Sequence, residues 1–324
     1  MRYFLLLSMV LFTTSCHSGN KGQLSGSNSG IVNSYGQLKV KGTLIVNEHG
    51  DTVALHGMSM FWSQWMGKYY NSDCIEWLVQ DWKCDVIRAA IGVEGGGYIE
   101  HPKREMRKLR KVVDACIDQG IYVIVDWHAH YAENHPEIAV DFFTAVAREY
   151  GSYPNIIYEI YNEPLMVSWD SVIRPYSENV IAAIRAYDPD NLIIAGTSQW
   201  SQNVDEASLN PLDDDNTAYA VHFYAGTHKQ WLRDKCDTAM KNGIALFVSE
   251  FGTCNSDGNG PIDYAELEKW FTYMDENNMS WCNWSVADKK ETASILKPGG
   301  SRHGNWSDDD LTESGKLIRK RLRK

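Results

Sequence analysis

The sequence predicts an α/β protein, a single-domain (β/α)8 TIM barrel, and three observations carry that prediction. Short apolar, β-branched runs recur eight times, with starts 25 to 36 residues apart. The segments between them place apolar residues at helical spacing. The runs themselves are continuously apolar, which is typical of parallel strands buried on both faces. A doubly wound open sheet is the alternative topology for the same alternation of strands and helices.

The eight predicted strands follow one another with no polar linker between them. In order they span residues 53–60, 86–92, 121–128, 156–163, 192–197, 217–224, 244–251 and 279–286. The segment 104–119 illustrates the intervening helices, because its apolar residues share one face and its charges the other. Eight strand–helix units fit one barrel, so we assign residues 34–324 to a single catalytic domain.

Composition argues against one class of partner and favours another. The chain has 31 Lys and Arg against 42 Asp and Glu, a net charge of −11, so a polyanion such as nucleic acid would be repelled. It also has 12 Trp and 17 Tyr, more aromatic surface than a core of this size usually needs. Flat apolar side chains suit pyranose rings. We therefore expect a sugar ligand, no nucleic acid, and a monomer.

The N-terminal residues resemble an export signal. Arg2 precedes an apolar run over residues 3–12, which is too short to span a membrane. Small residues then lead to Cys16, so 1–16 resembles a lipoprotein signal with a lipidated Cys16; a cleaved, unlipidated signal peptide is the alternative. Residues 17–33 are rich in Ser, Gly and Asn and are predicted to form a flexible tether. We expect an exported protein, anchored to a membrane at the cell surface or on the periplasmic side, or else secreted.

Two further features concern the rest of the chain. The basic segment 316–324 has a helical pattern and is predicted to be the last surface helix, with binding to acidic lipid as the alternative. Six cysteines remain besides Cys16. Cys116 and Cys282 lie in apolar runs and are predicted to be core thiols, whereas the pairing of the others stays open.

Polar or aromatic side chains close six of the predicted strands, where a purely structural residue would be apolar. They are Arg88 in the second strand, Asp126 to His128 in the third, Asn162 and Glu163 in the fourth, His222 to Tyr224 in the sixth, Glu250 in the seventh and Trp284 in the eighth. Active sites of (β/α)8 barrels lie at the carboxyl ends of the strands. Six coincidences at this end predict an active site there.

Glu163 and Glu250 end the fourth and seventh strands, on opposite sides of the barrel mouth. Glycoside hydrolysis uses such a pair of carboxyl groups, and at a separation of about 5–5.5 Å the pair acts with retention. We expect Tyr224 to donate a hydrogen bond to Glu250, and Arg88 to keep that carboxylate ionised with a low pKa. Asn162 is expected to hold the 2-OH of the sugar.

A series of motifs in this order resembles glycoside hydrolase family 5, and more closely its bacterial endo-1,4-β-glucanase branch. The motifs are HGMS (56–59), WSQW (62–65), VIRAAI (86–91), VIVDWH (123–128), YEIYNEP (158–164), HFYAGTH (222–228), VSEFG (248–252) and WCNWSVADKKE (281–291). Together they cover nearly all of residues 34–324.

The resemblance implies roles for individual residues. Glu163 is similar to the acid/base of the family and Glu250 to its nucleophile. The residues that resemble the supporting shell are Arg88, His128, Asn162, His222 and Tyr224. The residues that resemble substrate contacts are Trp284 under the −1 sugar, Trp65 and Trp200 as subsite aromatics, Lys289 and Glu291 on the glycone side, and His228. The loop with three glycines at 95–97 is expected to let Tyr98 reach the cleft.

No cofactor and no catalytic metal are expected. His128 and His130 form an HxH pair, but on the third strand, whereas metal-dependent amidohydrolase barrels carry theirs on the first. Three positions depart from the family pattern and concern subsites rather than chemistry: Phe61, Gly92 and Phe251.

These observations predict a retaining endo-1,4-β-glucanase that hydrolyses internal bonds of cellulose and related β-glucans with two glutamates. One alternative is the same machinery acting mainly on mixed-linkage glucan, glucomannan or xylan. The other is a non-catalytic surface lipoprotein that binds glycans.

Overall fold

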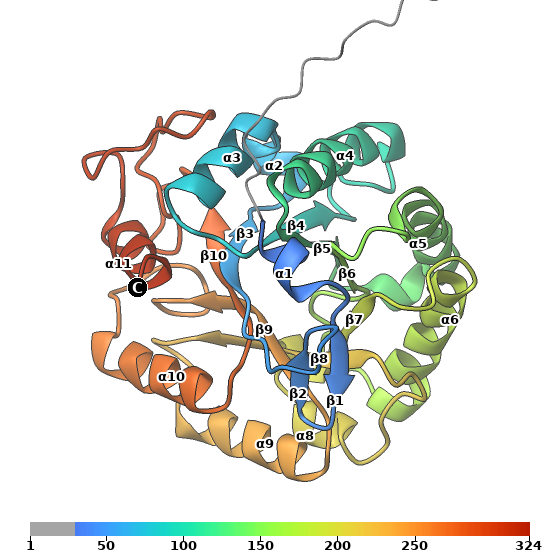
Figure 1. The fold of residues 1–324 in the computed structure, drawn as a ribbon. Helices are drawn as coiled ribbons and strands as arrows, with labels where there is room; N and C mark the ends of the chain where they lie inside the picture. The colour runs from blue at the N-terminus through green and yellow to red at the C-terminus, as the bar shows by residue number, and fades with distance from the viewer. Residues whose placement is uncertain (1–29) are drawn as a thin grey trace, which may run out of the picture.

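A computed structural model describes residues 30–324, and its centre is a closed barrel of parallel strands in the order β10-β3-β4-β5-β6-β7-β8-β9 (Figure 1). The predicted (β/α)8 barrel is confirmed, and the doubly wound sheet is wrong because β10 pairs with β3 and leaves no edge. The barrel strands are β3 (His56–Met60), β4 (Val86–Gly92), β5 (Tyr122–His128), β6 (Ile156–Glu159), β7 (Leu192–Ala195), β8 (Thr217–Tyr224), β9 (Leu246–Gly252) and β10 (Trp281–Val286).

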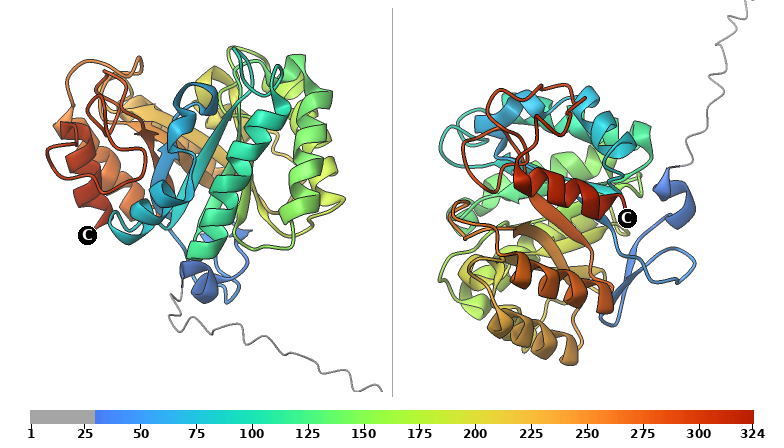
Figure 2. Two further views of the ribbon diagram at one scale, coloured as in Figure 1. Left: turned by 90° about the horizontal axis from the view of Figure 1, so that it is seen from above. Right: turned by 90° about the vertical axis from the view of Figure 1, so that its left-hand side faces the viewer.

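Helices form a ring outside the strands (Figures 1 and 2). The longer ones are α3 (Ser72–Gln80), α4 (Pro102–Gln119), α5 (Pro136–Tyr150), α6 (Arg174–Arg185), α9 (Gln230–Lys241), α10 (Tyr264–Glu276) and α11 (Glu313–Leu322). Short ones lie in the connections: α2 (Ser63–Met66), η1 (Gly67–Tyr69), η2 (Ala132–Asn134), the π-turn η3 (Trp169–Ile173), α7 (Ser198–Ser201) and α8 (Val204–Ala207).

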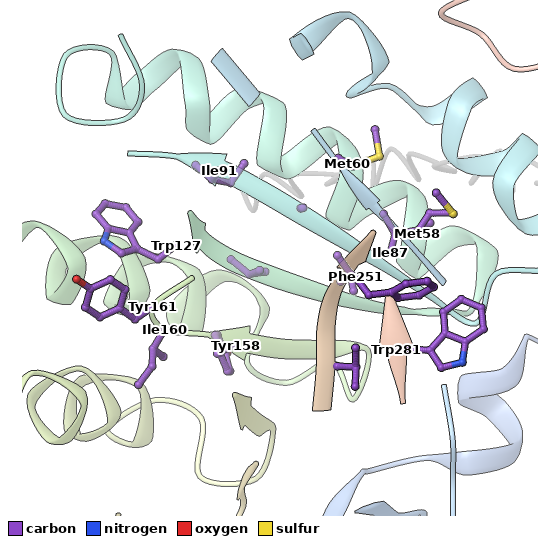
Figure 3. Close-up of a cluster of buried hydrophobic side chains, with 14 of the residues drawn as sticks. Met58, Met60, Ile87, Ile91, Trp127, Tyr158, Ile160, Tyr161, Phe251 and Trp281 are labelled. Carbon is purple, nitrogen blue, oxygen red and sulfur yellow. The ribbon is translucent and has the colours of Figure 1, made fainter. Parts of the chain in front are cut away.

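The main core lies between the strands and this ring. It contains large side chains that point outward from the strands, among them Ile87, Trp127, Tyr158 and Trp281, all fully buried (Figure 3). Because both faces of each barrel strand are covered, the strands are apolar along most of their length. This explains why their positions are evident from the sequence.

The inside of the barrel changes character along each strand, as β5 shows. Side chains alternate across a strand, so Tyr122, Ile124, Asp126 and His128 share the inner face. Tyr122 and Ile124 belong to an apolar cluster that fills the amino-terminal half of the barrel. Asp126 and His128 come next on the same face, at the carboxyl end. One strand therefore supplies packing at one end and functional groups at the other.

The segment before the barrel closes its amino-terminal end. It comprises α1 (Ile31–Tyr35), β1 (Lys39–Lys41) and β2 (Leu44–Val46), and the last two form an antiparallel pair (Figure 2). Val32 packs into the same cluster as Ile124, and its N–H donates to the carbonyl of Gly120 at 3.0 Å.

The expected boundary of the tether is therefore wrong. Residues 30–33 belong to the folded domain, because the apolar side chain of Val32 packs into the core. The Ser/Gly/Asn-rich composition around Val32 gave no indication of this contact. Cys16 and the signal segment 1–16 lie outside the described residues and remain predictions, as does the tether nature of 17–29. Within 30–324, no helix combines the length and apolarity that crossing a membrane requires.

The C-terminal segment forms a helix of the fold, and the cysteines of the described residues are free thiols. The segment 316–324 lies mostly in α11, which buries Ile318 and pairs Arg319 with Asp81 at 2.7 Å, so it is the last helix of the fold. The six cysteines of the described part are all buried and unpaired. Cys116 and Cys282 are core thiols, as predicted.

Candidate active site

A cleft of about 550 Å³ lies at the carboxyl ends of the barrel strands, within the size range of small-molecule and oligosaccharide sites. Its lining includes nine of the residues that the sequence singles out: Trp65, His128, Glu163, Trp200, His222, Tyr224, His228, Glu250 and Trp284. Lys289 and Glu291 line it as well and form an ion pair at 2.5 Å. Residues far apart in sequence thus converge on one cavity.

Exposed aromatic side chains stand on two opposite sides of this cleft. Trp65 follows β3 and is 59% exposed, and Trp200 follows β7 and is 38% exposed. The two strands are four places apart around the closed barrel, so the two residues lie on opposite sides of the mouth. An extended chain of flat rings that crosses the mouth meets an aromatic surface at each side.

Trp200 is held by an unusual turn. Gln199, Trp200 and Ser201 all have φ near 56°, a left-handed conformation that costs roughly 1–2 kcal/mol per non-glycine residue. The turn is fixed by hydrogen bonds to the segment after β6, since the N–H of Trp200 donates to the Pro164 carbonyl at 2.8 Å. Ser201 Oγ donates to the Asn162 carbonyl at 2.8 Å. The aromatic side chain is therefore tied to the segment that carries Glu163.

Arg88 lies fully buried beneath the cleft and contacts three carboxylates. Its guanidinium is 2.6 Å from Glu159, 3.0 Å from Asp126 and 3.0 Å from Glu250. It also donates to Asn162 Oδ1 at 2.7 Å. One fixed positive charge is shared among the three acids, so none of them has Arg88 to itself. Burial outweighs Arg88 at Asp126 and raises its pKa well above the ordinary value.

Glu250 lies on the inner face of β9, and both of its carboxyl oxygens accept hydrogen bonds. Oε2 accepts from Arg88 at 3.0 Å, and Oε1 accepts from the Tyr224 hydroxyl at 2.8 Å, the hydrogen bond expected from the sequence. Each carboxyl oxygen of Glu250 thus accepts a hydrogen bond from a group that keeps its proton at neutral pH. The side chain is held in one orientation, which a nucleophile requires.

The expected low pKa of Glu250 is wrong. Burial and the negative charge of Glu163 raise the pKa of Glu250 above 4.5, outweighing His222 and Arg88. The sequence identified the nearby arginine. It did not reveal that the carboxylate of Glu250 is desolvated, or that Glu159 and Asp126 also pair with Arg88.

Glu163 is contacted by two histidines, one at each oxygen. His222 Nδ1 is 3.0 Å from Oε1, and His130 Nε2 is 3.1 Å from Oε2. On its other side His222 Nε2 is 3.0 Å from Ser249 Oγ, and that hydroxyl donates to Glu159 at 2.6 Å. Because Ser249 has one proton and gives it to Glu159, His222 Nε2 must be the donor to Ser249.

A proton is therefore shared between His222 Nδ1 and Glu163 Oε1. Burial lowers the pKa of His222, but the carboxylate of Glu159, 3.6 Å from Nε2, and that of Glu163, hydrogen-bonded to Nδ1, outweigh burial and raise it to about 9. Burial likewise raises the pKa of Glu163, but the hydrogen bonds from His130 and His222 outweigh it and lower the pKa to about 2. With the cleft free of sugar, the proton lies on His222, directly beside the Glu163 carboxylate.

Asn162 has an amide group that awaits a partner. Its Oδ1 accepts from Arg88, whereas its Nδ2 is buried and has no hydrogen-bond partner among the described residues. A buried, unsatisfied donor is costly unless a ligand satisfies it. The sugar contact expected of Asn162 fits this free donor.

Trp284 ends β10 and lines the cleft with a fixed orientation. Its ring stacks on His128, with centroids 5.1 Å apart and planes 9° apart, and lies 5.1 Å from Phe61. His128 Nδ1 is 2.7 Å from Asp126, so the stack rests on the buried charged group. These contacts leave Trp284 only 6% exposed, at the cleft.

Trp284→Ala is expected to lower kcat/KM on cellotetraose, because Trp284 lines the cleft and is expected to lie under the −1 sugar. The loss should correspond to about 1–3 kcal/mol, the scale of a buried aromatic contact. Trp284→Phe, which keeps a flat ring, is the matched control and should retain most of the activity. A specificity constant that Trp284→Ala leaves unchanged would remove Trp284 from the site.

Tyr98 does not reach the cleft, and that expectation is wrong. Its ring packs edge-on against Trp127 and Phe142 at 5.2 and 5.1 Å, between α4 and α5. The glycines at 95–97 instead turn the chain back, and the N–H of Tyr98 donates to the carbonyl of Gly92 at 2.8 Å. The side chain therefore belongs to the strand–helix core.

Several cleft or supporting residues were not identified from the sequence. They are Trp62, Glu159, Gln199, Gln202, Ser249, Ser256, Asp257 and Gly258. Phe61 and His130 also line the cleft, but the sequence singled them out only as a departure from the family pattern and as half of an HxH pair. Glu159 had a signal, because a charged residue two positions after Ile157 faces the inside of the barrel. His130 had only the HxH spacing, which did not indicate its contact with Glu163, and the loop residues had no signal, since loop conformation decides where they point.

The ligand atoms of Glu163, His222 and Glu250 lie within 4.8 Å of one another, a spacing that a metal ion can bridge. The surroundings argue for another use. Glu250 already accepts from Arg88, whose positive charge disfavours a cation at this place. The spacing is also what two carboxylates on either side of a glycosidic bond require.

Comparison with known proteins decides which family has this site. Residues 46–290 match the family described as Cellulase (glycosyl hydrolase family 5). The chain belongs to glycosyl hydrolase family 5. The predicted resemblance is thereby confirmed, and the barrel is the fold of solved cellulases such as the catalytic domain of Thermobifida fusca endoglucanase Cel5A, at 34% identity and a TM-score of 0.87 over 90% of this chain and 99% of that one.

Several relatives of this family 5 protein are endoglucanases by name. Endoglucanase Z of Dickeya dadantii is 52% identical over 267 residues, covering 81% of this chain and 61% of that protein. The endoglucanase of Clostridium saccharobutylicum is 43% identical over 99% of this chain and 71% of its own length. A structure from Cytophaga hutchinsonii is 54% identical with a TM-score of 0.90, over 91% of this chain and 96% of that one. The chain spans about three fifths of the length of endoglucanase Z.

The three departures from the usual pattern of family 5 have structural reasons here. Phe61 packs on Trp284 and lies 5.5 Å below the ammonium of Lys289. Gly92 leaves room for Gln64, whose side-chain oxygen would be 1.8 Å from a Cβ at position 92. Phe251 stacks on Phe223 in the outer core, 5.0 Å between centroids.

Proposed function

We propose that the protein is a retaining endo-1,4-β-glucanase that hydrolyses internal bonds of cellulose and related β-glucans. The observation that carries the proposal is the pair of carboxylates Glu163, which is half-buried, and Glu250, which is buried, with oxygens within 4.8 Å of each other. That spacing fits retention, since inverting pairs stand about 6.5–9.5 Å apart to admit water. Trp65 and Trp200 on opposite sides of the cleft support a polymer that crosses it. The names of the relatives support the endoglucanase activity.

In the first step, an oxygen of Glu250 attacks the anomeric carbon, and the bond from that carbon to the glycosidic oxygen breaks. Glu163 gives a proton to the departing oxygen, so the leaving chain ends in a hydroxyl. In the second step, Glu163 takes a proton from water while the water oxygen attacks the same carbon. The ester bond to Glu250 breaks and both carboxyl groups return to their starting states.

The proton for the first step comes from the Glu163–His222 pair. In the sugar-free cleft it lies on His222 Nδ1, 3.0 Å from Glu163. When the glycosidic oxygen reaches Glu163, the proton passes back to the carboxyl group and on to that oxygen. His222 is thereby a proton reservoir for the acid, oriented by Ser249.

The pH dependence of kcat/KM should be a bell whose limbs follow from these shifts. Glu250 must be ionised to attack, so activity is lost as pH falls through its pKa, which lies above 4.5. The acid must be protonated, so activity is lost as pH rises through about 9, where His222 releases the shared proton. His222→Asn should lower kcat/KM by about 10²-fold or more. It should also move the alkaline limb to lower pH, because Glu163 then holds the proton without its partner.

His303→Asn is the matched control for this measurement, since His303 is exposed and pairs with Asp73 far from the cleft. It should leave both limbs in place. An alkaline limb that does not move in His222→Asn would contradict the shared proton, whatever the loss of rate.

Products released by the purified full chain, measured with and without chelator, test the activity itself. The substrates are carboxymethylcellulose, barley β-glucan, glucomannan and xylan. Cello-oligosaccharides and a fast fall in viscosity on the first substrate are expected for an endo-acting glucanase. Loss of activity with chelator would instead assign a metal to Glu163, His222 and Glu250. Activity confined to glucomannan, xylan or mixed-linkage glucan would keep the two glutamates and change the substrate. No activity on any of the four substrates, with or without chelator, would favour a non-catalytic glycan-binding lipoprotein.

Export and anchoring complete the proposal. Support comes from the signal-like residues 1–16, with Cys16 as the lipid attachment. We propose a monomer held at a membrane through this lipidated N-terminus, at the cell surface or on the periplasmic side, or a secreted one if the signal is cleaved without lipidation. Metabolic labelling with a palmitate analogue, compared between the full chain and Cys16→Ser, distinguishes the two.

A further inference from the structure

Trp231 is an exposed tryptophan at the rim of the barrel mouth. It is the second residue of α9, which follows β8, so it lies at the end of the barrel where the strands finish. It is 41% exposed, and it is not among the residues that enclose the cleft. The catalytic groups described above make no use of it.

Two contacts connect Trp231 to the wall of the cleft. Its ring lies 5.7 Å from that of His228, which lines the cleft, at an angle of 63°. The ammonium of Lys235 lies 6.0 Å from the centre of the same ring and donates to Asn203 Oδ1 at 2.5 Å. Asn203 follows Gln202, another residue of the cleft wall. The surface of Trp231 therefore continues the wall that Gln202 and His228 begin.

The position of Trp231 around the barrel indicates which part of a glucan it meets. Glu163, Trp200 and Trp231 follow the neighbouring strands β6, β7 and β8. Lys289 follows β10 and Trp65 follows β3, on the other side of the mouth. Glu163 is the proposed acid and protonates the leaving chain. The part of the mouth formed by the segments after β6 to β8 is therefore expected to bind the sugars of the leaving chain.

We propose that Trp231 is a platform for a distal glucose residue of the leaving chain, beyond the sugar that Trp200 contacts. Its ring stacks on the apolar face of that glucose, and Lys235 fixes the ring. This inference rests on the proposed function and extends it by one binding position outside the enclosed cleft. Its effect is a preference for longer chains.

Chain length therefore provides the test. Trp231→Ala is expected to lower kcat/KM on cellohexaose about two- to tenfold relative to its value on cellotriose, the scale of one aromatic contact. The loss should be in KM rather than in kcat. Trp231→Phe should restore most of the ratio. Tyr153→Ala is the matched control, because Tyr153 is 42% exposed and precedes β6 at the other end of the barrel.

Binding without turnover separates this inference from the proposed function. In a Glu250→Gln background, cellohexaose should bind about two- to tenfold more weakly when Trp231 is also replaced by Ala. Equal losses on cellotriose and cellohexaose, or no loss on either, would overturn the platform at Trp231. If Glu250→Gln with Trp231 intact does not bind cellohexaose and the unaltered protein cleaves no β-glucan, the proposed function itself fails.

Discussion

Glu250→Gln should abolish turnover of β-glucan while oligosaccharides still bind. Glutamine keeps the size of the side chain and its hydrogen bond from Tyr224, but it cannot form the bond to the anomeric carbon. Loss of a covalent nucleophile costs about 10⁴-fold or more in kcat. Hydrolysis of carboxymethylcellulose and calorimetric binding of cellohexaose measure the two halves of this prediction.

Trapping supplies independent evidence for the covalent step. A fluorinated cellobioside with a dinitrophenyl leaving group should lose dinitrophenolate and add the mass of one fluorocellobiosyl group, which has two sugar units, to the peptide that contains Glu250, and none in Glu250→Gln. Glu268→Gln is the matched control, since Glu268 is exposed on α10 and lies outside the cleft. Undiminished turnover in Glu250→Gln, or a label on another residue, would refute the assignment of the nucleophile.

Glu163→Ala should slow hydrolysis of β-glucan by about 10²–10⁴-fold, the usual contribution of a general acid. The effect should depend on the leaving group. A dinitrophenyl cellobioside needs no protonation to depart, so its first step should proceed at nearly the normal rate. Azide, which is small and needs no general base, should then accept the sugar from Glu250 and restore turnover.

The product of this rescue also reports stereochemistry. With retention, azide attacks the covalent intermediate and yields a β-glycosyl azide, which nuclear magnetic resonance identifies. Glu268→Ala serves as control and should neither lose activity nor respond to azide. If neither a good leaving group nor azide restores turnover in Glu163→Ala, Glu163 has a role other than acid/base.

The strands of the barrel could be predicted because burial on both faces gives each strand a local pattern in the sequence. Each strand is covered by helices outside and by other strands' side chains inside, so its sequence is a continuous apolar run. The polar residues that interrupt these runs, such as Arg88 and Glu250, are buried as well, so they are exceptions to the apolar composition of the strands and mark the site. The chain order of strands in a closed barrel then predicts which ends converge.

The remainder depends on geometry that no local pattern encodes. Tyr98 follows three glycines, and only the path of that loop decides that its ring packs on Trp127 rather than in the cleft. His130 lies in a loop as well, yet its contact with Glu163 helps to set where the shared proton lies. The pKa of Glu250 depends on how Arg88 divides its charge among three acids. The residues were identifiable, but their mutual distances were not.

The closure of the barrel by α1 and the β1–β2 pair places the start of the domain and the cleft at opposite ends of the barrel. Residue 30 joins the domain beside Gly120, at the end of the barrel opposite the cleft (Figure 2). The lipid anchor proposed above would therefore be attached on the side of the domain that faces away from the mouth. Trp65 and Trp200 lie on the other side, where a glucan would bind in the proposed function.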